Sequence, residues 1–119
     1  MANLSDNDRQ KIVYEVAKAY AEAVDLESRL WLEGDKAYAN SAELKANALY
    51  GELSKLKANL WGDWTSDAAA ATKAIDDAAD AVDTSINEVK GDIKNAQKVV
   101  RALGYLDQLI ALAAKFAVA

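Results

Sequence analysis

The sequence predicts an all-α protein, an antiparallel up-down-up-down four-helix bundle that forms a single domain over residues 1–119. The chain contains no proline, the residue that interrupts helices most strongly. Apolar residues recur at steps of three and four in four successive segments, as on the buried face of a helix. Gly-Asp pairs separate these segments, and glycine commonly ends a helix whereas aspartate commonly starts one. The pairs are Gly34-Asp35, Gly62-Asp63 and Gly91-Asp92.

The first helix is predicted near residues 5–33, with Ser5 as the N-cap that accepts hydrogen bonds from the first free amides. Its core row has the spacing of a coiled-coil heptad and consists of Ile12, Val16, Ala19, Ala23, Leu26 and Leu30. A second apolar row beside it consists of Val13, Ala17, Tyr20, Val24 and Trp31. Because two rows make a face wider than the seam of a two-stranded coiled coil, we expect this helix to contact two neighbours.

The second helix is predicted near residues 36–61, with a core row of Ala42, Ala46, Leu49, Leu53, Leu56 and Leu60. If the register of the first helix continued past Gly34, Glu33 and Asn40 would lie on the core row. The apolar phase therefore breaks at the glycine, which indicates a turn there. An alternative start near Ser41 is also open, because Asn40 with Glu43 three residues later resembles a capping box.

The third helix is predicted near residues 66–90, after a connection in which Thr65 or Ser66 is the N-cap. Its core row consists of Ile75, Ala79, Val82, Ile86 and Val89. This row continues without a phase break through Gly91 into a fourth segment near residues 92–118. The register alone thus allows an alternative fold, an oligomeric arrangement of three helices with one long C-terminal helix.

The charge distribution favours a turn at Gly91. Acidic residues dominate the segment before this glycine, whereas lysine and arginine dominate the residues that follow it. Folding the chain back would form three contacts: Lys94 with Glu88, Lys98 with Asp83 or Thr84, and Arg101 with Asp80 or Ala81. Each exposed pair contributes only about 0.2–1 kcal/mol, but together such pairs select which helix lies beside which. The four-helix bundle is therefore the predicted fold.

The fourth segment is apolar nearly all round, which is unusual for a helix on the surface of a bundle. Two explanations fit this pattern: the helix is central to the bundle, or its outer face packs on another chain. We predict that the residues most suited to bind a partner are Leu106, Leu109, Ile110, Leu112 and Phe116.

The composition excludes several classes of function. The chain has neither cysteine nor histidine, so it lacks thiol chemistry, disulfides, histidine catalysis and the usual zinc, haem and di-iron ligands. A net charge of −5 disfavours binding to nucleic acid. No stretch is apolar and long enough to cross a membrane, and the N-terminus lacks the apolar core of a signal peptide. We therefore expect a soluble, cytoplasmic protein without cofactors, and export by another route stays open.

Residues 76–80 form an acidic motif, Asp-Asp-Ala-Ala-Asp, that matches the DDxxD pattern of prenyl-transferring and terpene-cyclising enzymes. In those enzymes, carboxylates on one helical face hold Mg²⁺ against a pyrophosphate. They also need a second metal-binding motif, which this chain lacks. Asp83 extends the same face, so we interpret the motif as a solvated acidic stripe.

The three tryptophans, Trp31, Trp61 and Trp64, lie beside the first two predicted turns. Either they form an aromatic recognition patch, because such side chains dominate interface hot spots, or they close the ends of the bundle. We favour the second interpretation.

The lack of reactive groups and the surplus of apolar surface predict a non-enzymatic helical interaction or scaffold protein. Its partner is either another protein or a second copy of the chain. A second hypothesis is a carrier of an apolar ligand or lipid, because wide apolar stripes and small alanines can leave a cavity. A third is a designed or engineered bundle, suggested by even segment lengths and the lack of proline, cysteine and histidine.

Overall fold

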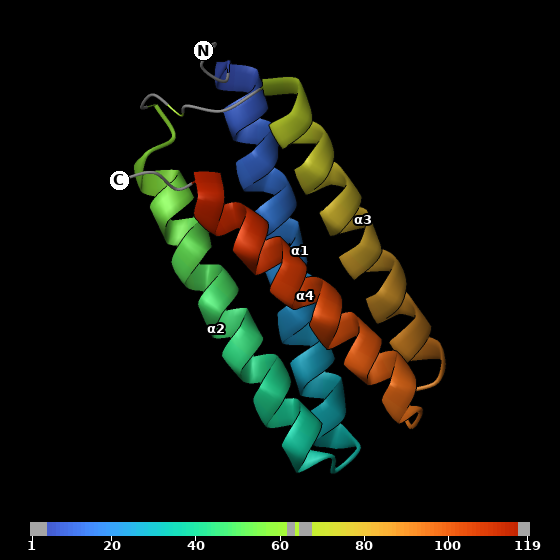
Figure 1. Cartoon of the computed structure of the whole chain (residues 1–119). Helices are drawn as coiled ribbons and strands as arrows, with labels where there is room; N and C mark the ends of the chain where they lie inside the picture. Colours follow the sequence, from blue (N-terminus) through green and yellow to red (C-terminus); the bar gives the residue numbers. More distant parts are fainter. Residues whose placement is uncertain (1–4, 62–63, 65–67, 117–119) are drawn as a thin grey trace.

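A computed structural model of the chain describes residues 5–61, 64 and 68–116. It contains four helices (Figure 1): α1 (Asp6–Leu32), α2 (Lys36–Ala58), α3 (Ala68–Gly91) and α4 (Ala96–Phe116). No strand occurs in this described part of the chain. The predicted all-α class and four-helix bundle are therefore confirmed, and the alternative with one helix continuous through Gly91 is wrong.

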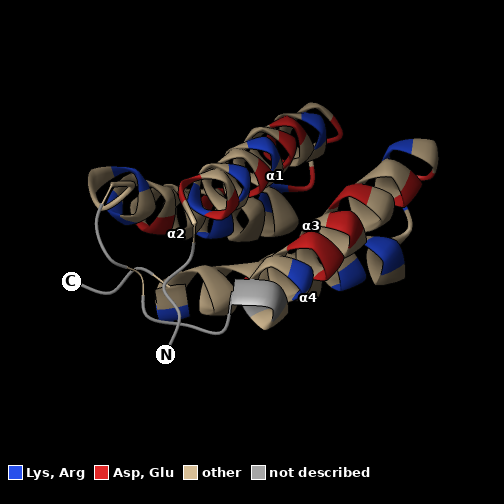
Figure 2. Ribbon diagram, turned by 90° about the horizontal axis from the view of Figure 1, so that it is seen from above, with Lys and Arg blue, Asp and Glu red and all other residues tan. Residues whose placement is uncertain are grey.

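The four helices form two antiparallel hairpins, α1 with α2 and α3 with α4, which pack side by side (Figure 2). In this arrangement α1 contacts α3 and α2 contacts α4, while α1 and α4 lie on one diagonal and α2 and α3 on the other. Helix direction alternates along the chain as predicted. However, the neighbours α1 and α3 run parallel, as do α2 and α4, so only two of the four neighbouring pairs are antiparallel (Figure 1). The connection from α2 to α3 consequently crosses one end of the bundle diagonally.

Side-chain caps fix where three of the helices begin. The Ser5 hydroxyl accepts a hydrogen bond from the Asp8 amide at 3.1 Å, and Asp35 accepts one from the Tyr38 amide at 3.2 Å. The predicted starts of the first two helices are thus confirmed, and the alternative start near Ser41 is wrong. α4 begins later than predicted because Asn95, whose Oδ1 accepts from the Gln97 amide at 3.1 Å, is its cap. The predicted cap at Thr65 or Ser66 lies outside the described residues.

Each of the two hairpin turns contains a Gly-Asp pair, but the glycine has a different backbone conformation in each turn. Gly34 adopts a left-handed backbone with φ of +80°, which is the conformation expected of a glycine that ends a helix. Gly91 has no positive φ and is the last residue of α3. The second reversal instead uses residues 92–95, where the Asn95 amide donates to the Asp92 carbonyl at 3.1 Å.

The ion pairs predicted between the third and fourth helices are wrong, because the second turn is longer than the prediction assumed. Arg101 pairs with Glu88 at 3.4 Å, and Lys98 pairs with Asp92 at 3.8 Å. The prediction assumed that the chain reverses directly at Gly91. Because residues 92–95 stand outside both helices, α4 is displaced toward the turn relative to α3, and each cation meets an acid closer to that turn.

The diagonal connection is held by two side chains with little exposed surface. Trp64 is 1% exposed and its Nε1 donates to the Asn59 carbonyl at 2.7 Å. Arg9, 6% exposed, donates its Nε to the Leu60 carbonyl at 2.6 Å and pairs with Asp6. The start of α1 is thereby tied to the end of α2. Trp64 closes this end of the bundle, as the favoured interpretation of the tryptophans predicts, but that interpretation is wrong for Trp31 and Trp61, which are exposed.

Candidate functional site

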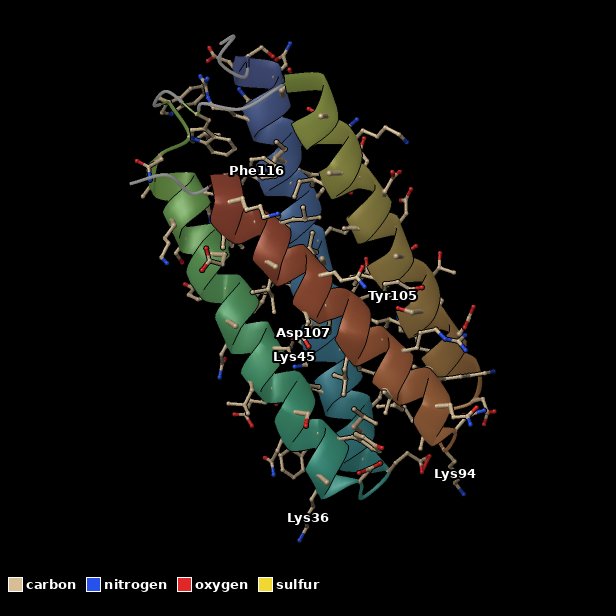
Figure 3. All side chains as sticks on the ribbon, viewed as in Figure 1. Lys36, Lys45, Lys94, Tyr105, Asp107 and Phe116 are labelled. Atoms are coloured by element: carbon tan, nitrogen blue, oxygen red, sulfur yellow. The ribbon has the colours of Figure 1, made fainter. Side chains whose placement is uncertain are left out.

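The five residues predicted to bind a partner lie in or against the core of the chain's own bundle. Leu106, Leu109 and Phe116 are at most 8% exposed, and Ile110 and Leu112 are half-buried against the same core. Phe116, at the end of α4, is labelled in Figure 3. Of the two explanations for the apolar fourth segment, burial within the bundle applies, because α4 packs against both α2 and α3. Binding of another chain by these residues would require the bundle to open, and it stays a prediction.

The exposed apolar side chains gather on the other hairpin. Among the described residues, eight large hydrophobic side chains are exposed, and six of these belong to α1 or α2. These six are Tyr14, Val24, Trp31, Leu32, Leu44 and Tyr50. Trp61 follows α2, and Val100 on α4 is the remaining one. An interaction surface is therefore better sought on the first hairpin than on α4.

We call four of the side chains on this hairpin the outer strip: the half-buried Tyr20 and the exposed Val24 and Trp31 on α1, with the exposed Tyr50 on α2. The rings of Tyr20 and Tyr50 meet with centroids 5.3 Å apart. Val24 and Trp31 follow Tyr20 at helical spacing, so they lie on the same side of α1. Trp31 is 40% exposed and Tyr50 is 55% exposed, which places the strip at the surface of the α1–α2 hairpin.

The sequence already contained a signal for the outer strip. Three of its residues, Tyr20, Val24 and Trp31, belong to the second apolar row predicted for the first helix. Periodicity alone does not show which part of that row the rest of the bundle covers. The Trp31 indole also donates to Glu27 at 3.3 Å, and Glu27 occupies the one polar position in the row. Tyr50 was missed, because it lies outside the apolar core row of its own helix.

Charged and apolar side chains together line each of three surface grooves. One, of about 290 Å³, lies between α3 and α4 and is lined by Glu88 and Arg101, among others, and by Tyr105, which is labelled in Figure 3. Two others, of about 220 and 450 Å³, share Glu33 and Ile93 at the end of the bundle that carries the two hairpin turns. These grooves do not test the carrier hypothesis, which stays a prediction.

Ion pairs join the two hairpins where their helices run parallel. Between α2 and α4, Lys45 lies 2.8 Å from Asp107 (Figure 3). Between α1 and α3 there are two pairs, each at 3.0 Å: Lys11 with Asp76, and Asp25 with Lys90. The hydrogen bond to Asp76 raises the pKa of Lys11, and hydrogen bonds from Lys90 and then Arg29 lower the pKa of Asp25.

One half-buried acid of α1, Glu22, lies on the side of this helix that borders α3. Burial raises the pKa of Glu22 to about 7, the carboxyl group of Asp83 on α3 adds to the shift, and Lys18 and Lys90 oppose it. Neither Glu22 nor Asp83 lines any of the grooves described above. We call the row formed by these two acids and the two ion pairs beside them the α1/α3 seam.

Sequence reasoning did not predict the ion pairs between α1 and α3. On α3, Asp76, Asp83 and Lys90 are seven residues apart, as are Lys11, Lys18 and Asp25 on α1. This spacing places each set on one helical face. It becomes a signal for these pairs only when α1 and α3 are known to be parallel neighbours.

The acidic motif at residues 76–80 is largely engaged in ion pairs: Asp76 with Lys11, and Asp77 with Lys73 at 3.1 Å. The described part of the chain contains no group of three or more carboxylates arranged to hold a metal ion. Within the same residues, no helix has the length and hydropathy needed to cross a membrane. Comparisons with protein-family models, with curated proteins and with solved structures give no match.

Proposed function

We propose that the chain is a non-enzymatic helical interaction protein that associates with a second copy of itself through the outer strip. The observation that carries the proposal is the concentration of exposed aromatic and aliphatic side chains on the first hairpin. Tryptophan and tyrosine are enriched among the few residues that dominate the binding energy at protein interfaces. Trp31 and Tyr50 are such residues, held in place by contacts with Glu27 and Tyr20 respectively.

A second copy is the partner favoured by the spacing of the row on α1. Two-fold dimers need a patch that is complementary to itself. The row occupies positions 13, 17, 20, 24, 27 and 31, and this spacing is symmetric about its midpoint. A second α1 running antiparallel would therefore set Tyr20 opposite Val24, and Trp31 opposite Val13. These two pairings set a large aromatic side chain against a smaller aliphatic one, and the third sets Glu27 opposite Ala17.

The absence of an enzymatic function is inferred from the available chemistry. The sequence contains no histidine and no cysteine. A carboxyl group with a pKa near 7, such as Glu22, is a candidate general acid or base when it lies in a cleft. Glu22 lies on a helix–helix seam instead, and the described grooves are lined by other residues.

The test is the molar mass of the protein, measured by size-exclusion chromatography with light scattering across a wide range of concentrations. We expect the mass to rise from one chain toward two as the concentration increases. Val24→Glu places like charges near the two-fold axis, and Trp31→Ala removes the largest anchor. Each substitution should weaken dimerisation about 10-fold or more.

Val100→Glu is the matched control, because Val100 is an exposed valine, 52% exposed, on the other hairpin. It should leave the dimerisation constant unchanged. A mass of one chain at every concentration would overturn the proposal and would leave a foreign protein as the occupant of the strip. If Val100→Glu weakens dimerisation as much as Val24→Glu does, the interface is not the outer strip.

A further inference from the structure

A row of exposed side chains on α1 lies between the outer strip and the α1/α3 seam. Tyr14, Ala21 and Ser28 are seven residues apart and all three are exposed, so they share the side of α1 that points away from the bundle. Val24 of the outer strip borders this row on one side. Asp25, which forms an ion pair with α3, borders it on the other. Because two of the three side chains in the row are small, a second helix can approach α1 closely there.

The charges on the α3 side of this row reverse their order along the helix. Four of them are Glu15, Lys18, Asp25 and Arg29. Positions 15 and 29 are equally distant from residue 22, and positions 18 and 25 lie four and three residues from it, so each charge has an opposite charge at the mirrored position. Lys11 likewise mirrors Glu33, the C-cap residue of α1. Glu22, at the centre, is half-buried on the side that borders α3.

We infer that Lys18 and Asp25 determine how two copies associate: a second α1 runs antiparallel beside the first, with Ala21 beside the two-fold axis and each Lys18 facing the partner's Asp25. This inference rests on the dimer proposed above. A two-fold axis between antiparallel helices keeps the same flank of both helices on one side of the contact, so the charged flanks meet each other. In a parallel pair, each charge would instead lie near its own copy and repel it.

The surroundings of the two residues suit this role. Lys18 is exposed and forms no ion pair with any residue that the structure describes. The Asp25 carboxylate is 40% exposed and accepts from Lys90 and Arg29, and an ionised carboxylate has about four acceptor sites in all. The two cations already bound to Asp25 weaken its attraction for a third. The pairs therefore select the orientation of the dimer, while the outer strip supplies most of its affinity.

The test reverses one charge in each of two chains. Lys18→Glu sets two acids together at both contacts across the axis, and Asp25→Lys sets two cations together. Each variant alone should dimerise about 10-fold more weakly than the unmodified chain at low salt. An equimolar mixture of the two variants should recover the unmodified dimerisation constant, because the mixed dimer has opposite charges at both contacts. Light scattering across a range of concentrations measures all three constants.

Lys73→Glu is the matched control, since Lys73 is an exposed lysine on α3, outside the proposed contact. It should dimerise like the unmodified chain and should not rescue Asp25→Lys. If the unmodified chain dimerises but the mixture of Lys18→Glu and Asp25→Lys is no tighter than its components, the inference is wrong and the proposed dimer stands. An unmodified chain that stays monomeric at every concentration overturns both.

Cysteine cross-linking tests the position of the axis without changing any charge. The chain has no cysteine, so Ala21→Cys introduces a single thiol. A disulfide between two copies requires that their Cα atoms lie about 4.4–6.8 Å apart, which only a residue beside the axis achieves with itself. Under mild oxidation Ala21→Cys should form a covalent dimer much faster than Ala111→Cys, whose alanine is exposed on α4. Equal rates for the two variants, in a chain that dimerises, would overturn the inference.

Discussion

The two hairpins bury similar core rows but differ in what they present to solvent. The first hairpin, α1 and α2, exposes six large apolar side chains, whereas the second, α3 and α4, exposes only Val100 among its described residues. Both hairpins carry many charges, and in the second the acids are concentrated on α3 while lysine and arginine are prominent on α4 (Figure 2). The buried hydrophobic residues explain why the chain folds, but they do not indicate what it binds. The exposed apolar side chains are concentrated on the first hairpin, and the functional hypothesis therefore concerns that hairpin.

The largest expected effect contrasts a buried leucine of the second hairpin with an exposed leucine of the first. Leu106 has no exposed surface and Leu44 is 71% exposed. Leu106→Ala should lower the free energy of unfolding by about 2–5 kcal/mol, because it removes buried apolar surface and leaves a cavity. Leu44→Ala should change it by less than about 0.5 kcal/mol. Urea denaturation measures both, and equal losses would contradict the contrast between the hairpins.

The second prediction compares the two hairpin turns. Gly34→Ala should lower the free energy of unfolding by about 1 kcal/mol, because a side chain is strained at φ of +80°. Gly91→Ala should raise it by about 0.4–1 kcal/mol, since Gly91 ends α3 without a positive φ and nothing lies within 4 Å of an added Cβ. Thermal or urea unfolding of the two variants checks this. Loss of stability in both would mean that the turns have the same backbone requirement.

The smallest expected effect concerns an ion pair that joins the hairpins. Because Lys90 and Arg29 lower the pKa of Asp25, its carboxylate contributes stability above about pH 3.8, and this contribution is lost as the pH falls. Asp25→Asn should cost about 0.2–1 kcal/mol at neutral pH, a range suited to a largely exposed pair. Unfolding measured at neutral and strongly acidic pH should show the difference disappearing in acid. A difference that grows in acid would mean that the pair does not form.

Local features of the fold were predictable because they depend on neighbours in the sequence. Helical spacing of apolar residues identified four helices, the phase break at Gly34 located the first turn, and Ser5 was recognised as a cap. The second turn was located only approximately. The position of its cap, Asn95, depends on how many residues the turn needs for α4 to pack on α3. No short-range sequence pattern encodes that number.

Features that involve contacts between helices were not predictable in the same way. No pattern in the sequence places α1 beside α3 in parallel, so the ion pairs that join these helices, such as that of Lys11 with Asp76, could not be predicted. Nor could it show that Leu106 and Phe116 would be enclosed by the chain's own helices while Trp31 stayed exposed. An apolar row indicates that a surface avoids water, but the same row serves equally for a core or for an interface.

By itself, the sequence determined the helical class, the number of helices and most of their limits, because backbone propensity, capping and apolar period act within a few residues along the chain. Only the tertiary structure decided which helices are neighbours, which apolar rows are covered and which charges meet. These choices depend on packing among segments distant in sequence, where the competing arrangements bury similar apolar area and differ in the shape and register of their contacts.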